Sequence, residues 1–296
     1  MRRRTAWILV AAVAAVALGA ATVGMVALLL RGGAPTSFGG SRYLALRASG
    51  ELPENPLVEM ALFERKPATL RVLVESLDRA ASDPGVEGVL LRVGGLEAGW
   101  GRVRELRSAI ERFGRSGKPV YAYLELVGNR EYYLASACSK VYALPTALID
   151  VTGLAAEVTF LRGTLDKLGV EADFVGVGKY KNAPNQYTET GFTQPHREQM
   201  ESLVESLFEE YLSAIADGRK LTPETVRQLV DAGPYDAQRA LEAGLVDELV
   251  YADELEQRLG AHKAVTPASY VGDGGGFALG GRAKLGNVPL VSLISY

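Results

Sequence analysis

Residues 83–93 read DPGVEGVLLRV, and this stretch decides the fold. The Asp-Pro-Gly triplet is a helix-stop and turn signal, and a dense valine and leucine run from Val86 to Val93 follows it at once. An apolar run without alternation is typical of a strand buried on both faces, as in the parallel sheets of α/β proteins. We therefore expect a strand over 86–93 in a sheet that is covered on both faces.

On both sides of this strand, apolar runs alternate with segments of helical period. The patterns predict strands at 42–47, 119–124 and 140–144, and extended chain at 172–177. They predict helices at 70–81, 103–113, 131–137, 161–168, 222–232 and 237–243. A long stripe over 200–216 predicts a helix that covers the core, with a partner-binding face as the alternative. Strands separated by single helices indicate right-handed βαβ units, so the fold class is α/β with a mostly parallel sheet and flanking helices.

Charge and composition exclude several classes of protein. The 296 residues carry 32 Lys and Arg against 35 Asp and Glu, a net charge of −3 that argues against a nucleic-acid binder. Cys138 is the single cysteine of the sequence, which rules out an internal disulfide framework and a cysteine metal cluster. His196 and His262, the two histidines, leave little room for a histidine-rich metal site.

The N-terminus carries a long apolar segment. Residues 6–30 contain no charged side chain and would span about 37 Å as a helix, enough for a bilayer core of about 30 Å. Three arginines precede the segment, so we predict a cytoplasmic tail at 1–5, a transmembrane signal anchor at 6–30 and an exported remainder. The alternative is a cleaved signal peptide. Residues 31–41 read as a linker off the membrane.

The C-terminus changes character after the predicted domain at 42–271. Residues 272–287 form a glycine-rich linker, and residues 288–296 read VPLVSLISY, a new apolar strand. We interpret 288–296 as the first strand of a second domain that is missing from this chain. The alternative is a terminal strand that returns to pair with the first domain.

Residues 174–184, FVGVGKYKNAP, are a candidate chemical site because we expect a buried strand to end within them, and strand ends in open α/β sheets are the usual place for ligands. Lys179 and Lys181 are two residues apart, so on extended chain at most one faces inward. A lysine held in a desolvated pocket can act as a general base near neutral pH. The alternative is that both are solvated loop lysines.

Six segments of the chain match one family in order and spacing: 83–92, 116–122, 132–137, 165–170, 178–183 and 240–248. On these segments the chain, from about Pro67 to Glu248, resembles the signal peptide peptidase SppA family, also called protease IV. Any single segment is a weak signal, but the collinear set is specific. The resemblance implies a ClpP/crotonase-like α/β fold and a Ser/Lys catalytic dyad.

In the long form of that family two homologous domains are fused, the first supplying a lysine base and the second a serine nucleophile. Lys181 lies at the family's lysine position, in a Tyr-Lys-x-Ala context, so the resemblance implies that it is the catalytic base and that Lys179 is a flanking residue. The family's serine position is occupied by Asn129, and Arg130 and Glu131 replace the glycines that follow it.

Asparagine cannot attack a carbonyl, and the lost glycines remove backbone that would donate N–H groups to an oxyanion. Residues 91–96 also lack the Ser-Pro-Gly-Gly run of catalytic domains. The chain therefore resembles the N-terminal half of the long form, without a nucleophile of its own. Ser136 and Ser139 do not match the nucleophile position, and we interpret them as packing or surface residues.

The resemblance implies a membrane-anchored serine endopeptidase that degrades cleaved signal peptides and needs no metal or organic cofactor. It implies a bacterial inner-membrane location with the soluble domain on the extracytoplasmic side. The implied partners are remnant signal peptides or other unfolded peptides, the bilayer through 6–30, and further copies in a homo-oligomer, with no nucleic acid. His196 reads as a polar helix-start residue and His262 as a solvated loop residue, since a lysine base needs neither.

Two other functions are compatible with the same fold. A non-catalytic scaffold or pseudoenzyme domain would explain the absent serine motif in this chain. A crotonase-type acyl-CoA enzyme would share the α/β architecture, but an exported domain does not ordinarily meet CoA esters.

Overall fold

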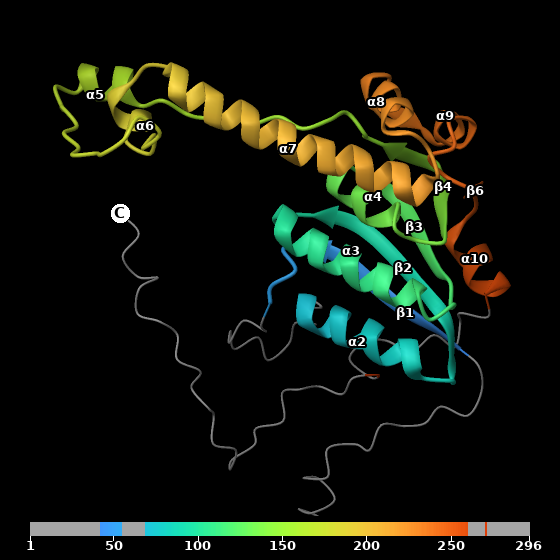
Figure 1. Cartoon of the computed structure of the whole chain (residues 1–296). Helices are drawn as coiled ribbons and strands as arrows, with labels where there is room; N and C mark the ends of the chain where they lie inside the picture. The colour runs from blue at the N-terminus through green and yellow to red at the C-terminus, as the bar shows by residue number, and fades with distance from the viewer. Residues whose placement is uncertain (1–41, 55–68, 260–269, 271–296) are drawn as a thin grey trace, which may run out of the picture. The chain divides into compact units, whose positions relative to one another are not determined.

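The computed structural model describes residues 42–54, 69–259 and 270, all within one compact unit of the chain. These residues form an α/β structure in which helices flank a parallel-rich sheet (Figure 1). The predicted α/β class with a mostly parallel sheet and flanking helices is therefore confirmed. The predictions for 1–5, 6–30, 31–41, 272–287 and 288–296 all lie outside the described residues.

The described sheet consists of β1 (Arg42–Gly50), β2 (Val86–Leu96), β3 (Val120–Val127), β4 (Lys140–Ile149), β5 (Tyr235–Asp236) and β6 (Glu248–Leu249). Its order is β1-β2-β3-β4-β5, and β6 also pairs with β4. The first four strands pair in parallel, as does β6 with β4, whereas the short β5 runs antiparallel to β4. All four strands that the sequence predicts within the sheet are present.

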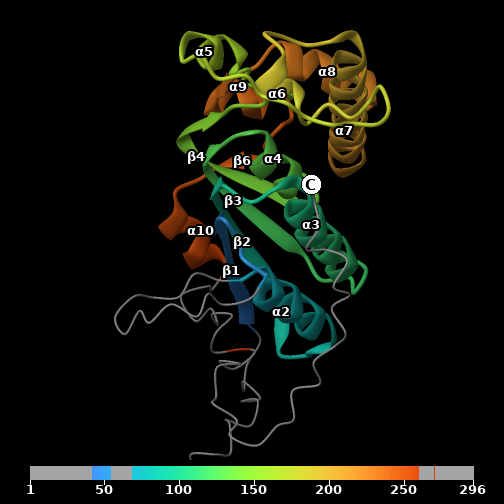
Figure 2. The ribbon, with the colours of Figure 1, turned by 90° about the vertical axis from the view of Figure 1, so that its left-hand side faces the viewer.

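The described helices are α2 (Leu70–Ser82), α3 (Trp100–Gly114), α4 (Asn129–Ala135), α5 (Arg162–Lys167), α6 (Asn185–Thr188), α7 (Gln194–Arg219), α8 (Pro223–Asp231), α9 (Ala237–Glu242) and α10 (Ala252–Arg258). Figure 2 shows α2 and α3 on one face of the sheet and α10 on the other. The sheet is therefore covered on both faces, as the apolar run in β2 predicts.

Strand β2 shows why that run does not alternate. Leu90 packs in a cluster with Tyr123, Val250 and Leu255 on the side of α10. Leu91, 1% exposed, points to the opposite face because neighbouring side chains on a strand alternate. Both sets are buried, so the consecutive positions 89–91 in the middle of the strand all favour an apolar residue.

The turn at 83–85 forms as the sequence predicts. The Asp83 carboxylate accepts a hydrogen bond from the Gly85 N–H at 2.8 Å, immediately after α2 ends. This hydrogen bond is the main cause that lowers the pKa of Asp83 below its ordinary value, and the Tyr270 hydroxyl donates to the same carboxylate. The turn returns the chain to the sheet, where β2 begins at Val86.

A long arm leaves this sheet after β4. The chain runs out beside α7 to α5 and α6 and then returns along α7 itself (Figure 1). We call residues 152–210 the arm and residues 161–190 its tip. Helix α7 begins at a Thr193 cap, whose side chain accepts from the His196 N–H. At its other end Gly218 lies so close to α4 that a β-carbon there would be 1.9 Å from the Ser136 carbonyl oxygen.

Two predictions about the arm need correction. Residues 172–177 form no strand among the described elements, because no described strand lies beside them to pair with. The stripe over 200–216 covers the core only in its second half, where Tyr211, Leu212, Ile215 and Ala216 are buried. Leu203, in the first half, is 53% exposed because this part of α7 projects beyond the sheet.

Within residues 42–54, 69–259 and 270, no helix is both long and apolar enough to cross a bilayer. The predicted transmembrane anchor, at 6–30, falls outside these ranges.

Candidate functional site

The carboxyl ends of β2 and β3 meet where α4 begins, which is the usual position for a ligand site in an open α/β sheet. Asn129 is the first residue of α4, directly after β3 and Gly128. The position that the resemblance assigns to the serine nucleophile therefore lies at the expected edge. The side chain present there is an amide.

All contacts of the Asn129 side chain are structural. Its Oδ1 accepts hydrogen bonds from the backbone N–H groups of Thr152 and Gly153 at 3.2 and 3.3 Å, and its Nδ2 donates to the Gly153 carbonyl at 2.6 Å. The Tyr211 hydroxyl of α7 donates to the same Oδ1 at 3.0 Å. Burial raises the pKa of Tyr211, so its hydroxyl keeps the proton that it donates. Asn129 thus ties α4 to the start of the arm.

Glu131 occupies the backbone donors at the same edge. Its carboxylate, on a residue only 7% exposed, accepts from the Leu96 N–H at the end of β2 and from the Gly128 N–H at 3.0 Å. An oxyanion hole needs free N–H groups aimed at the reacting carbonyl oxygen. These two N–H groups instead donate their hydrogen bonds to the Glu131 carboxylate of the same chain.

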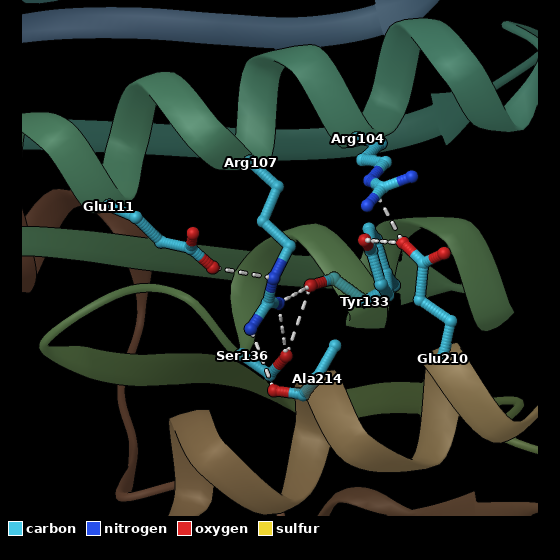
Figure 3. Close-up of polar contacts among 7 residues, drawn as sticks. All are labelled: Arg104, Arg107, Glu111, Tyr133, Ser136, Glu210 and Ala214. Atoms are coloured by element: carbon cyan, nitrogen blue, oxygen red, sulfur yellow. Dashed lines mark hydrogen bonds and ion pairs between the residues drawn. The ribbon is translucent and has the colours of Figure 1, made fainter.

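A buried arginine fastens α7 to this region (Figure 3). Arg107 of α3 is 4% exposed, and its guanidinium donates to the Tyr133 carbonyl, to Ser136 Oγ at 2.8 Å and to the Ala214 carbonyl at 2.7 Å. Its Nε lies 2.9 Å from Glu111 Oε1. One side chain therefore links α3, α4 and α7. We call Arg107 and these partners the Arg107 junction.

The predicted catalytic base lies elsewhere. Lys181 is exposed on the tip, between α5 and α6, and its backbone N–H donates to the Gly178 carbonyl at 3.2 Å. The expectation that a buried strand ends just before it is wrong, since Val175 and Val177 are 98% and 92% exposed. The structure does not bring Lys181 to Asn129, because the tip contacts α7 at Gln199, about 18 Å along the helix from Tyr211, the α7 residue that contacts Asn129.

The neighbouring lysine is tied to its own loop. The Lys179 ammonium lies 4.6 Å from the centre of the Tyr180 ring. A hydrogen bond with Tyr180 is the largest cause that raises the pKa of Lys179, which favours the protonated amine. A general base must be neutral, so this contact is consistent with Lys179 being a flanking residue.

Comparison with protein families decides the assignment. The sequence model described as Peptidase family S49 matches residues 112–266, slightly more than half of the chain. The chain belongs to peptidase family S49. The matched S49 region begins in α3 and includes β3, α4, β4, the arm and the helices after it.

Several relatives carry names of S49-type peptidases. Over 66% of its own length, the chain is 34% identical to "Serine protease SPPA, chloroplastic" of Arabidopsis thaliana. Over 63% of its own length, it is 28% identical to "Protease 4" of Salmonella typhi. It is 25% identical to "Putative signal peptide peptidase SppA" of Enterococcus faecium over 74%. The matches cover 29%, 32% and 64% of those proteins. They confirm the resemblance to SppA-type peptidases.

Sequence reasoning missed the environment of His196. We expected a polar helix-start residue, but the ring is 7% exposed and packs 4.9 Å from Phe192 and 6.0 Å from Phe160, measured between ring centres. Its Nδ1 has no hydrogen-bond partner among the described residues. The ring therefore joins α7 to the segment that leads to the tip. His262 lies outside the described residues.

Three other residues have clear structural surroundings. Ser136 is fully buried in the Arg107 junction, and Ser139 accepts a hydrogen bond from the Val120 N–H at 3.1 Å, which confirms the packing and surface interpretation of both serines. Burial raises the pKa of Cys138 to about 12, so this cysteine is held as an unreactive thiol. Within the described ranges no cluster of three His, Cys, Asp or Glu side chains is arranged to hold a metal ion.

Proposed function

We propose that this chain is the base-supplying part of a membrane-anchored serine endopeptidase of the Ser/Lys type, which degrades cleaved signal peptides at the bacterial inner membrane. Membership of family S49 supports the peptidase class. The names of the relatives, a serine protease and a putative signal peptide peptidase, support the serine type and the peptide substrate. In this proposal Lys181 is the general base, and the serine lies outside residues 1–296.

The observation that carries the proposal is the pair Asn129 and Glu131. Asn129 stands at the nucleophile position with its amide bound to Thr152, Gly153 and Tyr211, and it has no oxygen that could attack a carbonyl. The Glu131 carboxylate accepts hydrogen bonds from the two N–H groups, of Leu96 and Gly128, at the adjoining strand ends. This edge is therefore built as a structural joint, so both the nucleophile and the oxyanion donors must come from elsewhere.

The proposed reaction is acyl transfer. Neutral Lys181 takes the proton of a serine hydroxyl whose oxygen lies about 3 Å from the amine nitrogen. The serine oxygen then bonds to the peptide carbonyl carbon, the amine of the leaving peptide departs with a proton from the lysine, and an acyl-enzyme remains. Water, deprotonated by the same amine, hydrolyses the acyl-enzyme and restores the serine. No cofactor takes part.

The exposure of Lys181 adds a requirement. An amine in water is protonated at neutral pH, and desolvation is what favours its neutral form. Lys181 is exposed in the single chain, so a further protein surface must cover the tip before the amine can act as a base. A homo-oligomer, or a second domain, would supply that surface. The proposed anchor at 6–30 would keep the site near membrane-embedded peptides.

The alternative is a non-catalytic scaffold, which the same Asn129 and Glu131 contacts favour. A fluorophosphonate probe, which reacts with activated serines, separates the two functions. We expect no labelled serine in chain 1–296, and labelling of a serine encoded beyond it in the complete gene product, lost on Lys181→Ala. A known serine peptidase run in parallel verifies the probe.

Two results would overturn the proposal. A labelled serine within 1–296 would place the nucleophile in this chain. An unlabelled complete gene product would identify the protein as a scaffold.

A further inference from the structure

The loop that carries Lys181 is a tight turn. Gly178 has a φ of +92°, a left-handed conformation that favours glycine, and its carbonyl accepts a hydrogen bond from the Lys181 N–H at 3.2 Å. A β-carbon at Gly176 would lie 3.6 Å from Lys181 Cγ, so the lysine stem lies against the backbone of the preceding segment. The direction in which the Lys181 side chain leaves the tip therefore depends on how this turn is held.

Both neighbours of Lys181 are tied to α7. On one side, the Tyr180 hydroxyl donates to Glu198 Oε2 at 3.1 Å. On the other side, the Asn182 amide donates to the side-chain oxygen of Gln199. The two acceptors are consecutive residues of the helix, so the turn is held on each side of Lys181. We call these four side chains, of residues 180, 182, 198 and 199, the α7 clamp.

Further hydrogen bonds brace the clamp. The Gln194 amide donates to Glu198 Oε1 at 3.2 Å, which orients the carboxylate. The Asn185 amide donates to Asn182 Oδ1 at 3.1 Å and to Thr193 Oγ1 at 3.2 Å. Because the oxygen of Asn182 accepts this bond, its amide nitrogen is left to face α7. Thr193 is the N-cap of α7, so the brace ends on the same helix that carries the clamp acceptors.

Helix α7 connects the clamp to the helices that cover the sheet. It is continuous over Gln194–Arg219, and the Arg107 junction holds it at Ala214, about 22 Å along the helix from Gln199. A group that is fixed to α7 at the clamp is therefore fixed relative to the rest of the fold.

We propose that the α7 clamp positions Lys181 for proton transfer, which makes the four clamp side chains positioning residues of the base. The inference rests on the proposed role of Lys181 as the general base. Proton transfer needs the amine nitrogen about 3 Å from the serine oxygen, and a displacement of about 1 Å can slow a reaction about 100-fold. A turn that is held on both sides of Lys181 keeps the amine within this tolerance.

The clamp contributes little to the stability of the fold. All four of its side chains are exposed or half-buried, and polar contacts at such positions add little to the free energy of unfolding. Loss of the clamp should therefore lower the rate of the reaction and leave stability unchanged. This difference separates a positioning role from a structural one.

Steady-state hydrolysis of an apolar signal-peptide substrate by the complete gene product tests the positioning role. Tyr180→Phe removes one clamp bond and Gln199→Met removes the other, and both keep most of the side-chain volume. We expect each substitution to lower kcat about 5-fold, the equivalent of one ordinary hydrogen bond. The double variant should lose more than the product of the two effects, because either bond alone still holds the turn. KM and the thermal unfolding temperature should not change.

Two further variants separate the clamp from general effects. Gln199→Glu restores an oxygen acceptor for the Asn182 amide, so it should recover most of the kcat that Gln199→Met loses. Tyr187→Phe removes a hydroxyl from the same tip and keeps the ring that stacks on Phe174 at 5.7 Å between ring centres. Within the described ranges this hydroxyl makes no hydrogen bond to α7, so Tyr187→Phe should leave kcat unchanged.

Limited proteolysis tests the clamp without using peptidase activity. Trypsin cleaves after lysine, and the bond after Lys181 lies in the clamped turn, whereas the bond after Lys167 lies in the same tip outside it. In the full chain 1–296 in detergent, the Tyr180→Phe and Gln199→Met double variant should be cleaved after Lys181 at least about 5-fold faster, with no change after Lys167. Mass spectrometry of the fragments distinguishes the two cuts.

Several results would overturn the clamp. An unchanged kcat in the double variant would do so, as would an equal rise in cleavage after both lysines. A fall in unfolding temperature that accompanies the fall in kcat would give the four side chains a structural role instead. Lys181→Ala, measured in parallel, keeps the two proposals apart. Loss of activity in Lys181→Ala beside an unaffected double variant would refute the clamp alone, and full activity in Lys181→Ala would refute the base assignment and, with it, the positioning role.

Discussion

The two ends of α7 differ in their surroundings. Its C-terminal end is held to α3 and α4 by the buried Arg107 guanidinium, whereas its N-terminal end carries the tip, whose apolar side chains are exposed to water. At the Arg107 junction the guanidinium has partners on α3, α4 and α7. At the tip, Val175 is 98% exposed and the backbone of 171–177 makes no hydrogen bond to other backbone groups within the described ranges. The junction is formed within one chain, whereas the tip leaves apolar side chains exposed.

The same contrast separates the edge at Asn129 and Glu131 from the tip that carries Lys181. The strand ends at Leu96 and Gly128 are saturated by Glu131, so the body gains a joint where an oxyanion hole would lie. The tip, by contrast, retains an accessible amine at Lys181. Under the proposed function, Asn129 and Glu131 have structural roles, and Lys181 is the reacting group.

The largest effect on stability is expected at the Arg107 junction. Arg107→Ala removes a buried charge together with the hydrogen bonds that it donates to the Tyr133 and Ala214 carbonyls and to Ser136 Oγ, so it should lower the free energy of unfolding by about 3–5 kcal/mol. Chemical denaturation followed by circular dichroism measures the change. The matched control is Arg104→Ala, whose exposed pair with Glu210 should contribute less than about 1 kcal/mol. Equal losses in the two variants would contradict the contrast between junction and surface.

A second prediction concerns acid. Partial burial raises the pKa of Asp247, but hydrogen bonds from Arg219 and from the Val141 N–H outweigh it and leave the pKa below its ordinary value. The stability that this carboxylate contributes is therefore present above the pKa of the unfolded chain, about 3.9, and is lost as pH falls through the lower folded value.

Replacement of the carboxylate isolates this contribution. Asp247→Asn should cost about 1–3 kcal/mol at pH 7, and its unfolding free energy should converge with that of the unmodified chain in acid. The control, Asp166→Asn, breaks an exposed pair with Arg162 and should cost about 0.5 kcal/mol or less. If the difference in unfolding free energy between Asp247→Asn and the unmodified chain stays constant with pH, Asp247 is not the source of the acid-sensitive stability.

The smallest effect is expected at the tip, and it sharpens the comparison because the same substitution is made in both regions. Val175→Ala should change the free energy of unfolding by less than about 0.5 kcal/mol, since the side chain touches little. Val103→Ala, at a fully buried position of α3, should cost about 2 kcal/mol. Thermal unfolding of the isolated chain measures both. A large loss for Val175→Ala would show that the tip is already packed within one chain.

The sequence predicts most of the sheet because the spacing of apolar residues along the chain is a local signal. Five of the eight residues from Val86 to Val93 are valine or leucine, three of them consecutive at 89–91, and that pattern indicates a strand covered on both faces. The same reasoning fails at 172–177, where β-favouring residues are present but no neighbouring strand is available. It also fails on the first half of α7, since a stripe of helical period does not reveal whether anything covers it.

The contacts at the candidate site could not be predicted from local pattern. Arg107 reads as an ordinary polar position on α3, and its partners Tyr133 and Ala214 lie 26 and 107 residues away in the chain. The resemblance located Asn129 and Glu131 and predicted that they depart from a catalytic motif. The resemblance could not show that the Glu131 carboxylate accepts hydrogen bonds from the Leu96 and Gly128 N–H groups.

The most direct measurement is the hydrolysis of an apolar signal-peptide substrate by the complete gene product, with Lys181→Ala compared with Lys167→Ala. Both residues are exposed lysines of the tip, so the two substitutions remove the same charge from the same region. We expect Lys181→Ala to lower kcat/KM by about 10²–10⁴-fold, the usual contribution of a general base, and Lys167→Ala to leave it unchanged. Full activity in Lys181→Ala, or equal losses in both variants, would contradict the assignment of Lys181 as the base.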